Sequence, residues 1–257
     1  MSIKQNNQFE IGIVVPCYNE VDRIQLSKFS FYLSSNDSIF ICFVNDGSTD
    51  GTQKKLADFV NLNPKRSKLI NLTKNQGKAE AVRQGLFTLL NYSKFQFVGY
   101  WDADLAAPLT EIQGFIEKFK SNNELKAVCG SRILRLGSSI HRSVFRHYIG
   151  RIFATIVSNM LKIPVYDTQC GAKIFRVELA EFIFSEKFLS RWFFDVELFA
   201  RIIENIGRQN TIYSVYELPL SKWHDQGQSK VTWGNVLQTP LELFRIYIFY
   251  RKRMTKL

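Results

Sequence analysis

The sequence predicts an α/β fold in which a mostly parallel central sheet is flanked by helices. Short apolar runs of strand length alternate with segments whose apolar residues recur at helical spacing. Alternation of this kind indicates parallel strand pairing with helices on both faces of the sheet. With 257 residues the chain can bury a sizeable core, and it contains no internal repeat, low-complexity segment or linker.

The predicted elements follow one another from the N-terminus. Five apolar runs are predicted to be strands: Ile11–Pro16, Ile39–Asn45, Leu69–Leu72, Phe95–Asp102 and Ala127–Ser131. Four amphipathic segments between them are predicted to be helices: Val21–Leu33, Asp50–Asn61, Lys78–Leu90 and Thr110–Lys120. Helical spacing returns around Phe145–Leu161 and again over Trp233–Arg253. We therefore predict one domain over residues 1–231 and an amphipathic, basic C-terminal helix over residues 232–257.

The composition narrows the choice of partner and compartment. The net charge of +11 indicates an anionic partner: nucleic acid, anionic lipid or a phosphorylated ligand. The four cysteines have no CxxC spacing, so we expect buried thiols in a reducing cytosol rather than disulfides or a zinc site. The N-terminus lacks the apolar core of a secretory signal, and no run of about 18 uncharged apolar residues occurs. We therefore expect a cytoplasmic protein without a spanning helix.

Polar clusters follow three of the predicted strands. They are Tyr18–Glu20, Asp46–Ser48 and Asp102–Asp104. Ligands of parallel sheets bind beyond the carboxyl ends of the strands, so all three clusters are expected at one edge of the sheet. Asp102 and Asp104 are two residues apart and can face one ion, and hard carboxylate ligands suit Mg²⁺ or Mn²⁺. The alternative is an ordinary solvated loop.

Other nucleotide-binding patterns are missing. The chain has neither the GxGxxG fingerprint of dinucleotide-binding domains nor a Walker phosphate loop. Nucleotidyl transfer would require a glycine-rich basic loop after the first strand, where this chain has PCYNE. A nucleic-acid binder is disfavoured because the aromatic residues lie mostly in apolar runs rather than among basic residues.

Several motifs, in order along the chain, carry a family resemblance. The first four resemble the signature series of family 2 inverting glycosyltransferases, which have the Rossmann-like GT-A fold: PCYNE (Pro16–Glu20), VNDGSTDGT (Val44–Thr52), NQGKAEAVRQG (Asn75–Gly85) and DAD (Asp102–Asp104). The later motifs resemble the dolichyl-phosphate β-glucosyltransferase branch: GSR (Gly130–Arg132), DTQCGAKIF (Asp167–Phe175), RWFFDVEL (Arg191–Leu198) and WHDQGQSKV (Trp223–Val231).

The resemblance implies transfer of a hexose, glucose in this branch, from a nucleotide diphosphate sugar to a polyprenyl phosphate. It implies a Mg²⁺ or Mn²⁺ ion held on the donor diphosphate by Asp102 and Asp104, with Asp104 also catalytic. The other donor-binding residues that it implies are Pro16, Tyr18, Glu20, Asp46 on the base, Lys78, and Lys230 on the diphosphate. Many polyprenyl-phosphate enzymes of this group carry Gln where this chain has Ala106, which puts a third protein ligand in doubt.

The chemistry of the acceptor decides what the remaining candidates do. A phosphate monoester is largely dianionic at neutral pH and needs cationic positioning, whereas a hydroxyl acceptor needs a general base. With a phosphate acceptor, Arg132 is a candidate catalytic and acceptor-binding residue, and Asp195 orients the nucleophile or an arginine. With a hydroxyl of a cell-envelope glycan, which is the alternative acceptor, Asp195 is the base. Asp195 can also be a helix N-cap, because a helical pattern follows it.

A long stretch without acidic residues favours a membrane partner. Between Leu125 and Tyr166 there is no Asp or Glu, whereas seven Lys or Arg residues occur. Arg142 and Arg146 are one helical turn apart, so together they can clamp the acceptor phosphate. A cationic amphipathic helix here, and the basic one at the C-terminus, can bind an anionic membrane surface peripherally. The alternative is that both helices pack their apolar faces on the core.

Overall fold

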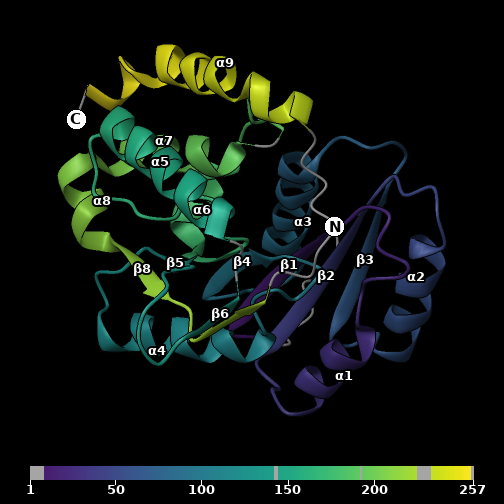
Figure 1. The fold of residues 1–257 in the computed structure, drawn as a ribbon. Coiled ribbons are helices and arrows are strands. Elements are labelled where there is room, and N and C mark those ends of the chain that lie inside the picture. Colours follow the sequence, from purple (N-terminus) through teal and green to yellow (C-terminus); the bar gives the residue numbers. More distant parts are fainter. Residues whose placement is uncertain (1–8, 142–143, 192, 225–232, 256–257) are drawn as a thin grey trace. The chain divides into compact units, whose positions relative to one another are not determined.

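The computed structural model describes residues 9–141, 144–191, 193–224 and 233–255. The chain forms two compact units, each built from two segments (Figure 1). Met1–Leu105 and Gly171–Lys187 make the first unit, and Ala106–Cys170 and Phe188–Leu257 make the second.

The first unit contains five strands in the order β3-β2-β1-β4-β7 (Figure 1). The pairs β3–β2, β2–β1 and β1–β4 are parallel, and β7 runs antiparallel to β4. The central strands are buried along nearly their whole length, which explains their continuous apolar sequences. The strands are β1 (Ile11–Cys17), β2 (Ile39–Asp46), β3 (Ser67–Leu72), β4 (Phe97–Trp101) and β7 (Ala172–Arg176).

Helices cover both faces of this sheet. On one face, the Phe43 ring of β2 packs against Phe29 of α1 (Leu26–Ser34) and Phe59 of α2 (Thr52–Leu62), with ring centroids 5.2 and 5.4 Å apart. The next residue, Val44, points to the opposite face. There α3 (Lys78–Tyr92) lies close against β1 and β2. Position 85 of this helix admits only glycine, because a methyl group added to Gly85 would lie 2.9 Å from Val44. Helix α6 (Val177–Ile183) packs beside α3.

The second unit combines two pairs of strands with a group of helices. Strands β5 (Ala127–Ser131) and β8 (Val215–Pro219) are parallel, as are β6 (Ser139–His141) and β9 (Lys222–His224). Helix α7 contacts α5, α8 and α9 (Figure 1). The helices are η1 (Leu109–Glu111), α4 (Ile112–Ser121), α5 (Val144–Leu161), α7 (Phe194–Ile206), α8 (Arg208–Ser214), α9 (Trp233–Tyr250) and η2 (Arg253–Thr255).

The predicted α/β class with mostly parallel pairing is confirmed. Each predicted strand and helix forms; β5 has the predicted bounds and the other ends are shifted, whereas β6, β7, β8 and β9 lie outside the predicted strands. Helix α1 begins at Leu26 rather than Val21, because the preceding residues form a loop bound to the neighbouring loop. All four cysteines are buried, as expected, and none of them forms a disulfide. In the described part of the chain, no helix combines the length and apolar character needed to cross a bilayer. The boundary at residue 231 stays a prediction.

Candidate functional site

The loops after β1 and β2 are bound to each other by hydrogen bonds. Asn19, in the left-handed conformation with φ 49°, donates its backbone N–H to Ser48 Oγ at 3.0 Å and accepts from the Thr49 N–H at 2.9 Å. The Glu20 N–H donates to Thr52 Oγ1 at 2.8 Å. Polar side chains of VNDGSTDGT therefore hold PCYNE in a fixed conformation. Within that motif, Glu20 is buried, whereas Pro16 and Tyr18 are half-buried.

Asp46 closes β2 and holds the start of α3. Its carboxylate accepts the backbone N–H groups of Gln76 at 2.7 Å and Gly77 at 2.8 Å, and the Asn75 side-chain amide at 3.1 Å. The side chain is only 2% exposed. The structure thus gives Asp46 a positioning role for the loop leading to Lys78, and contact with a nucleobase stays a prediction.

The acidic pair lies in a turn directly after β4, where it meets two cations. Lys78 Nζ is 2.5 Å from Asp102 Oδ1, and Arg23 Nη2 is 3.2 Å from Asp104 Oδ2. The side chains of Asp102 and Asp104 are 38% and 25% exposed, so both reach solvent. Leu105 closes the turn in the left-handed conformation with φ 52°, a strained state for a branched residue that is typical of functional turns. The convergence predicted for the clusters Tyr18–Glu20, Asp46–Ser48 and Asp102–Asp104 is confirmed, because Asn19 bonds to Ser48 and Arg23 contacts both Glu20 and Asp104.

The absence of a side chain on Gly171 leaves room for the carboxylate of Asp102. The Asp102 N–H donates to the Gly171 carbonyl at 3.0 Å, which ties the end of β4 to the start of β7. A β-carbon on Gly171 would lie 1.8 Å from Asp102 Oδ2, so only glycine admits this position of the carboxylate. Gly171 thus controls where the first acid of DAD points.

The donor set fits a divalent cation that is shared with a diphosphate. Mg²⁺ is typically bound through one or two carboxylates, with water and ligand phosphate completing its shell. Asp102 and Asp104 are two such ligands. Among the described residues, no cluster of three or more His, Cys, Asp or Glu side chains could hold a metal ion. At the position in doubt, Ala106 is buried and offers no ligand atom.

In the second unit, Arg132 is held in a half-buried chain of hydrogen-bonded charged residues. Its guanidinium forms two hydrogen bonds with Asp167, from Nε at 2.7 Å and from Nη2 at 2.8 Å, and lies over the Trp223 ring at 5.6 Å. Glu217 in turn accepts the Asp167 and Tyr166 N–H groups at 2.7 Å each. Arg132 is therefore fixed in orientation.

Asp195 lies in the first turn of α7 and is 3% exposed. The N-cap residue of this helix is Phe193, and no side chain caps it. The N-cap alternative for Asp195 is therefore wrong, because the helix begins before this residue. A carboxylate in a first turn is still favoured by the helix dipole.

Three candidates are not described as side chains. Lys230 and Arg142 lie outside the described residues, and Arg146 lies in α5 in a part where only the backbone is described. Their proposed roles stay predictions.

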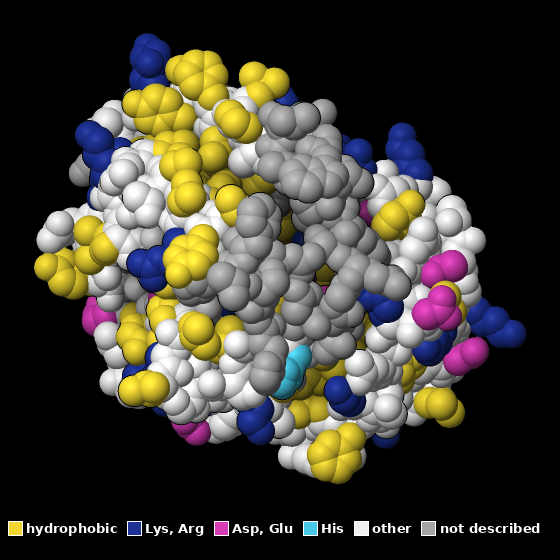
Figure 2. All heavy atoms as spheres, viewed as in Figure 1, with side chains coloured by type: hydrophobic (Ala, Val, Ile, Leu, Met, Phe, Trp, Pro, Cys, Tyr) yellow, Lys and Arg dark blue, Asp and Glu magenta, His cyan; other side chains and the backbone are white. Residues whose placement is uncertain are grey.

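The second unit exposes apolar side chains on two helices. Figure 2 shows them gathered where α9 lies in Figure 1, with basic side chains at the margin. The exposed basic residues around η2 are Arg251, Lys252 and Arg253. The exposed apolar residues are Tyr148, Ile149, Ile152 and Ile156 on α5, and Leu241, Phe244, Tyr247, Ile248 and Phe249 on α9.

Other proteins share this sequence and this fold. The sequence model of the family described as Glycosyl transferase family 2 matches residues 12–184. A dolichyl-phosphate beta-glucosyltransferase of Trichomonas vaginalis is 31% identical over 250 residues, covering 93% of this chain and 71% of that protein. The human dolichyl-phosphate beta-glucosyltransferase is 32% identical over 204 residues, covering 74% of this chain and 61% of that protein.

Solved structures resemble the fold at much lower sequence identity. A crystal structure of glucosyl-3-phosphoglycerate synthase from Mycobacterium tuberculosis in complex with UDP has a TM-score of 0.67 at 16% identity. It covers 93% of this chain and 80% of that chain. A structure of the same enzyme with Mn²⁺, UDP-glucose and phosphoglyceric acid has a TM-score of 0.65 at 14% identity, covering 96% of this chain and 80% of that chain. The likeness is one of fold.

Proposed function

This chain belongs to glycosyltransferase family 2, and on that premise we propose that it transfers glucose from UDP-glucose to a polyprenyl phosphate of the dolichyl or undecaprenyl type, with inversion. The observation that carries the proposal is the pair of solvent-reaching carboxylates Asp102 and Asp104, held at the end of a parallel strand beside Lys78 and Arg23. Relatives at about 30% identity are named dolichyl-phosphate beta-glucosyltransferases, which supports this donor sugar and this acceptor class.

The first unit is proposed to bind the donor. Asp102 and Asp104 would hold a Mg²⁺ or Mn²⁺ ion, which neutralises charge as the diphosphate leaves. Lys78 forms an ion pair with Asp102 and adds a positive charge to this region. Asp46 keeps Lys78 in place through the loop at residues 75–77, and the bound loops after β1 and β2 form the nucleotide side.

The second unit is proposed to bind the acceptor. A phosphate monoester attacks without a general base, because it already carries the negative charge of a nucleophile at neutral pH. Arg132, fixed by Asp167, is suited to orient such a dianion, and Arg142 and Arg146 are the further cations proposed for it. Asp195 would orient the nucleophile or one of these arginines.

A lipid-linked acceptor requires the protein to reach a membrane. We propose that it binds the cytoplasmic surface of an anionic membrane peripherally, through the exposed apolar residues of α5 and α9 and the basic residues Arg251–Arg253. Four buried thiols that do not form disulfides support a reducing compartment.

The test is a panel of UDP- and GDP-sugars, each incubated with Mg²⁺ or Mn²⁺ and a short polyprenyl phosphate, with products identified by mass. We expect a glucosyl phosphate product from UDP-glucose. A glycan acceptor with a free sugar hydroxyl is included in the same panel. Transfer to the hydroxyl acceptor, and not to the polyprenyl phosphate, would contradict the proposal.

A further inference from the structure

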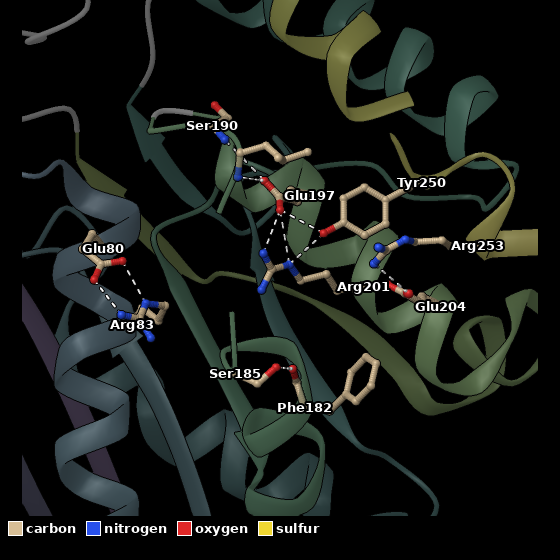
Figure 3. Close-up of polar contacts among 11 residues, drawn as sticks. Glu80, Arg83, Phe182, Ser185, Ser190, Glu197, Arg201, Glu204, Tyr250 and Arg253 are labelled. Atoms are coloured by element: carbon tan, nitrogen blue, oxygen red, sulfur yellow. Dashed lines mark hydrogen bonds and ion pairs between the residues drawn. The ribbon is translucent and has the colours of Figure 1, made fainter. Parts of the chain in front are cut away.

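A buried network on α7 is used by none of the roles described above. Glu197 is fully buried and accepts hydrogen bonds through both carboxylate oxygens (Figure 3). One oxygen accepts from Arg201 Nη2 at 2.8 Å and from Tyr250 Oη at 2.9 Å. The other accepts the backbone N–H groups of Leu189 at 2.7 Å and Ser190 at 3.3 Å. One carboxylate therefore links α7, α9 and the segment that precedes α7.

Helix α9 holds the same segment at a second point. Glu242 of α9 is hydrogen-bonded to Ser190 Oγ, and this hydroxyl accepts the Phe193 N–H at 2.8 Å. Phe193 is the N-cap residue of α7, so the entry to the helix depends on a contact with α9. Asp195 therefore lies between two residues whose positions are fixed by hydrogen bonds that lead to α9, Phe193 before it and Glu197 after it.

The chemistry of the network argues for a role in positioning. A buried ion pair generally gives no net stability over well-packed apolar residues, because desolvation cancels the attraction between the charges. Burial and the charge of Glu197 raise the pKa of Tyr250 well above its ordinary value, so the phenol stays protonated and remains a donor. Arg201 also packs over the Phe188 ring at 4.1 Å. These directional contacts admit one arrangement of the segment.

We propose that Glu197 is a positioning residue for Asp195, and that α9 braces it through Tyr250 and Glu242. The inference rests on the proposed function, in which Asp195 orients the nucleophile or an arginine. It adds that α9, one of the two helices with exposed apolar residues, also sets the geometry of the acceptor side. Loss of the contacts made by Tyr250 and Glu242 of α9 should slow the transfer step and leave donor binding unchanged.

The test compares Tyr250→Phe, Glu242→Gln and Glu197→Gln with the unmodified protein. Tyr250→Phe removes one hydroxyl and keeps the ion pair, so it should fold even where Glu197→Gln does not. The hydroxyl donates to Glu197 and accepts from Arg201 Nε at 3.0 Å, so we expect Tyr250→Phe to lower kcat by roughly five- to a hundredfold, the loss typical of two hydrogen bonds, with KM for the donor unchanged within twofold. Adding it to Glu197→Gln should cost little more, because both act on one network.

The matched control is Glu204→Gln, on the same helix. Glu204 forms an ion pair with Arg253 at 3.3 Å in a more exposed position (Figure 3), and its loss should leave kcat unchanged. Amide hydrogen exchange gives a second measurement that needs no substrate. The N–H groups of Leu189, Ser190 and Phe193 should exchange at least about fivefold faster in Tyr250→Phe, as expected for local opening.

The outcomes separate the two proposals. If the unmodified protein does not glucosylate a polyprenyl phosphate, the proposed function fails. The exchange measurement still tests whether α9 fixes the segment that precedes α7. A folded Tyr250→Phe variant with unchanged exchange in this segment overturns the positioning role. So does a variant whose donor KM rises in step with its loss of kcat, because that pattern indicates general damage to the fold.

Discussion

Gly171→Ala tests whether the placement of one carboxylate controls activity. Gly171 does not have the positive φ angle that disfavours other residues. The substitution therefore adds a methyl group without forcing the backbone into an unfavourable conformation. The added methyl group would lie 1.8 Å from Asp102 Oδ2, whereas such contacts are essentially never shorter than 3.0 Å. The carboxylate must therefore retreat by at least about 1.2 Å, or the start of β7 must move by as much.

The expected size of the effect follows from that displacement. A misplacement of about 1 Å at a catalytic group costs about a hundredfold in rate, which corresponds to about 2.7 kcal/mol. Stability should change little, because the Asp102 side chain is 38% exposed and can rotate towards solvent. We expect kcat/KM for UDP-glucose to fall about a hundredfold, with the Tm close to that of the unmodified protein.

Gly114→Ala is the matched control, since Gly114 lies inside α4. Its added methyl group would meet Leu218 at 3.5 Å, an ordinary contact, and should stabilise the helix by about 0.5–1 kcal/mol without changing activity. The assay measures UDP release with saturating acceptor at several Mn²⁺ concentrations. Full activity of Gly171→Ala at low Mn²⁺ would refute the link between this glycine, Asp102 and the metal.

Four other perturbations give expected outcomes. Asp104→Asn should abolish transfer and leave the fold intact, and EDTA should do the same to the unmodified protein; full activity in chelator would contradict the metal proposal. Asp46→Ala removes the acceptor of the part-buried Gln76 and Gly77 N–H groups, at about 0.5–1.5 kcal/mol per hydrogen bond, so calorimetry should show a Tm lower by about 2 °C or more, and donor KM should rise more than kcat falls. Arg146→Ala should lower acceptor-dependent kcat/KM roughly ten- to over a hundredfold, whereas normal transfer by it and an inactive Asp195→Asn would indicate a hydroxyl acceptor. Burial raises the pKa of Cys42 to about 12, so this thiol should resist iodoacetamide at pH 8 in the folded protein and react once urea unfolds it, as mass spectrometry would show.

The strands could be predicted because burial on both faces leaves a continuous apolar signal. Every residue of β2 is buried, and the predicted Ile39–Asn45 differs from it by one residue. The polar clusters after the strands were also predictable, because parallel topology alone brings the carboxyl ends of strands to one edge. Asn19 and Ser48 bond to each other there, and Glu20 and Asp104 both contact Arg23, for that reason.

The features that could not be predicted from the sequence depend on contacts between residues that are far apart along the chain. Helix α1 was predicted to begin at Val21, but the Val21 N–H bonds to Asp50, 29 residues away. The contact of Asp46 with the base stays a prediction, but its hydrogen bonds to a loop about 30 residues further on were not predicted. Glu197 and Gly171 lie inside the quoted motifs, yet their roles depend on Tyr250 and Asp102, partners that no local spacing identifies.

The proposed metal site has two acidic ligands, and such a site would make the binding of the ion and of the donor depend on each other. Asp102 already has Lys78 as a counter-ion, and within the described parts of the chain no third acid joins the pair. Free protein should therefore bind Mn²⁺ weakly, and the diphosphate must supply much of the affinity. By thermodynamic reciprocity, the ion must tighten UDP-glucose by the same factor by which UDP-glucose tightens the ion. Calorimetric titrations with the ion first or with UDP-glucose first should give the same total binding free energy. The ion should dissociate together with UDP after each turnover.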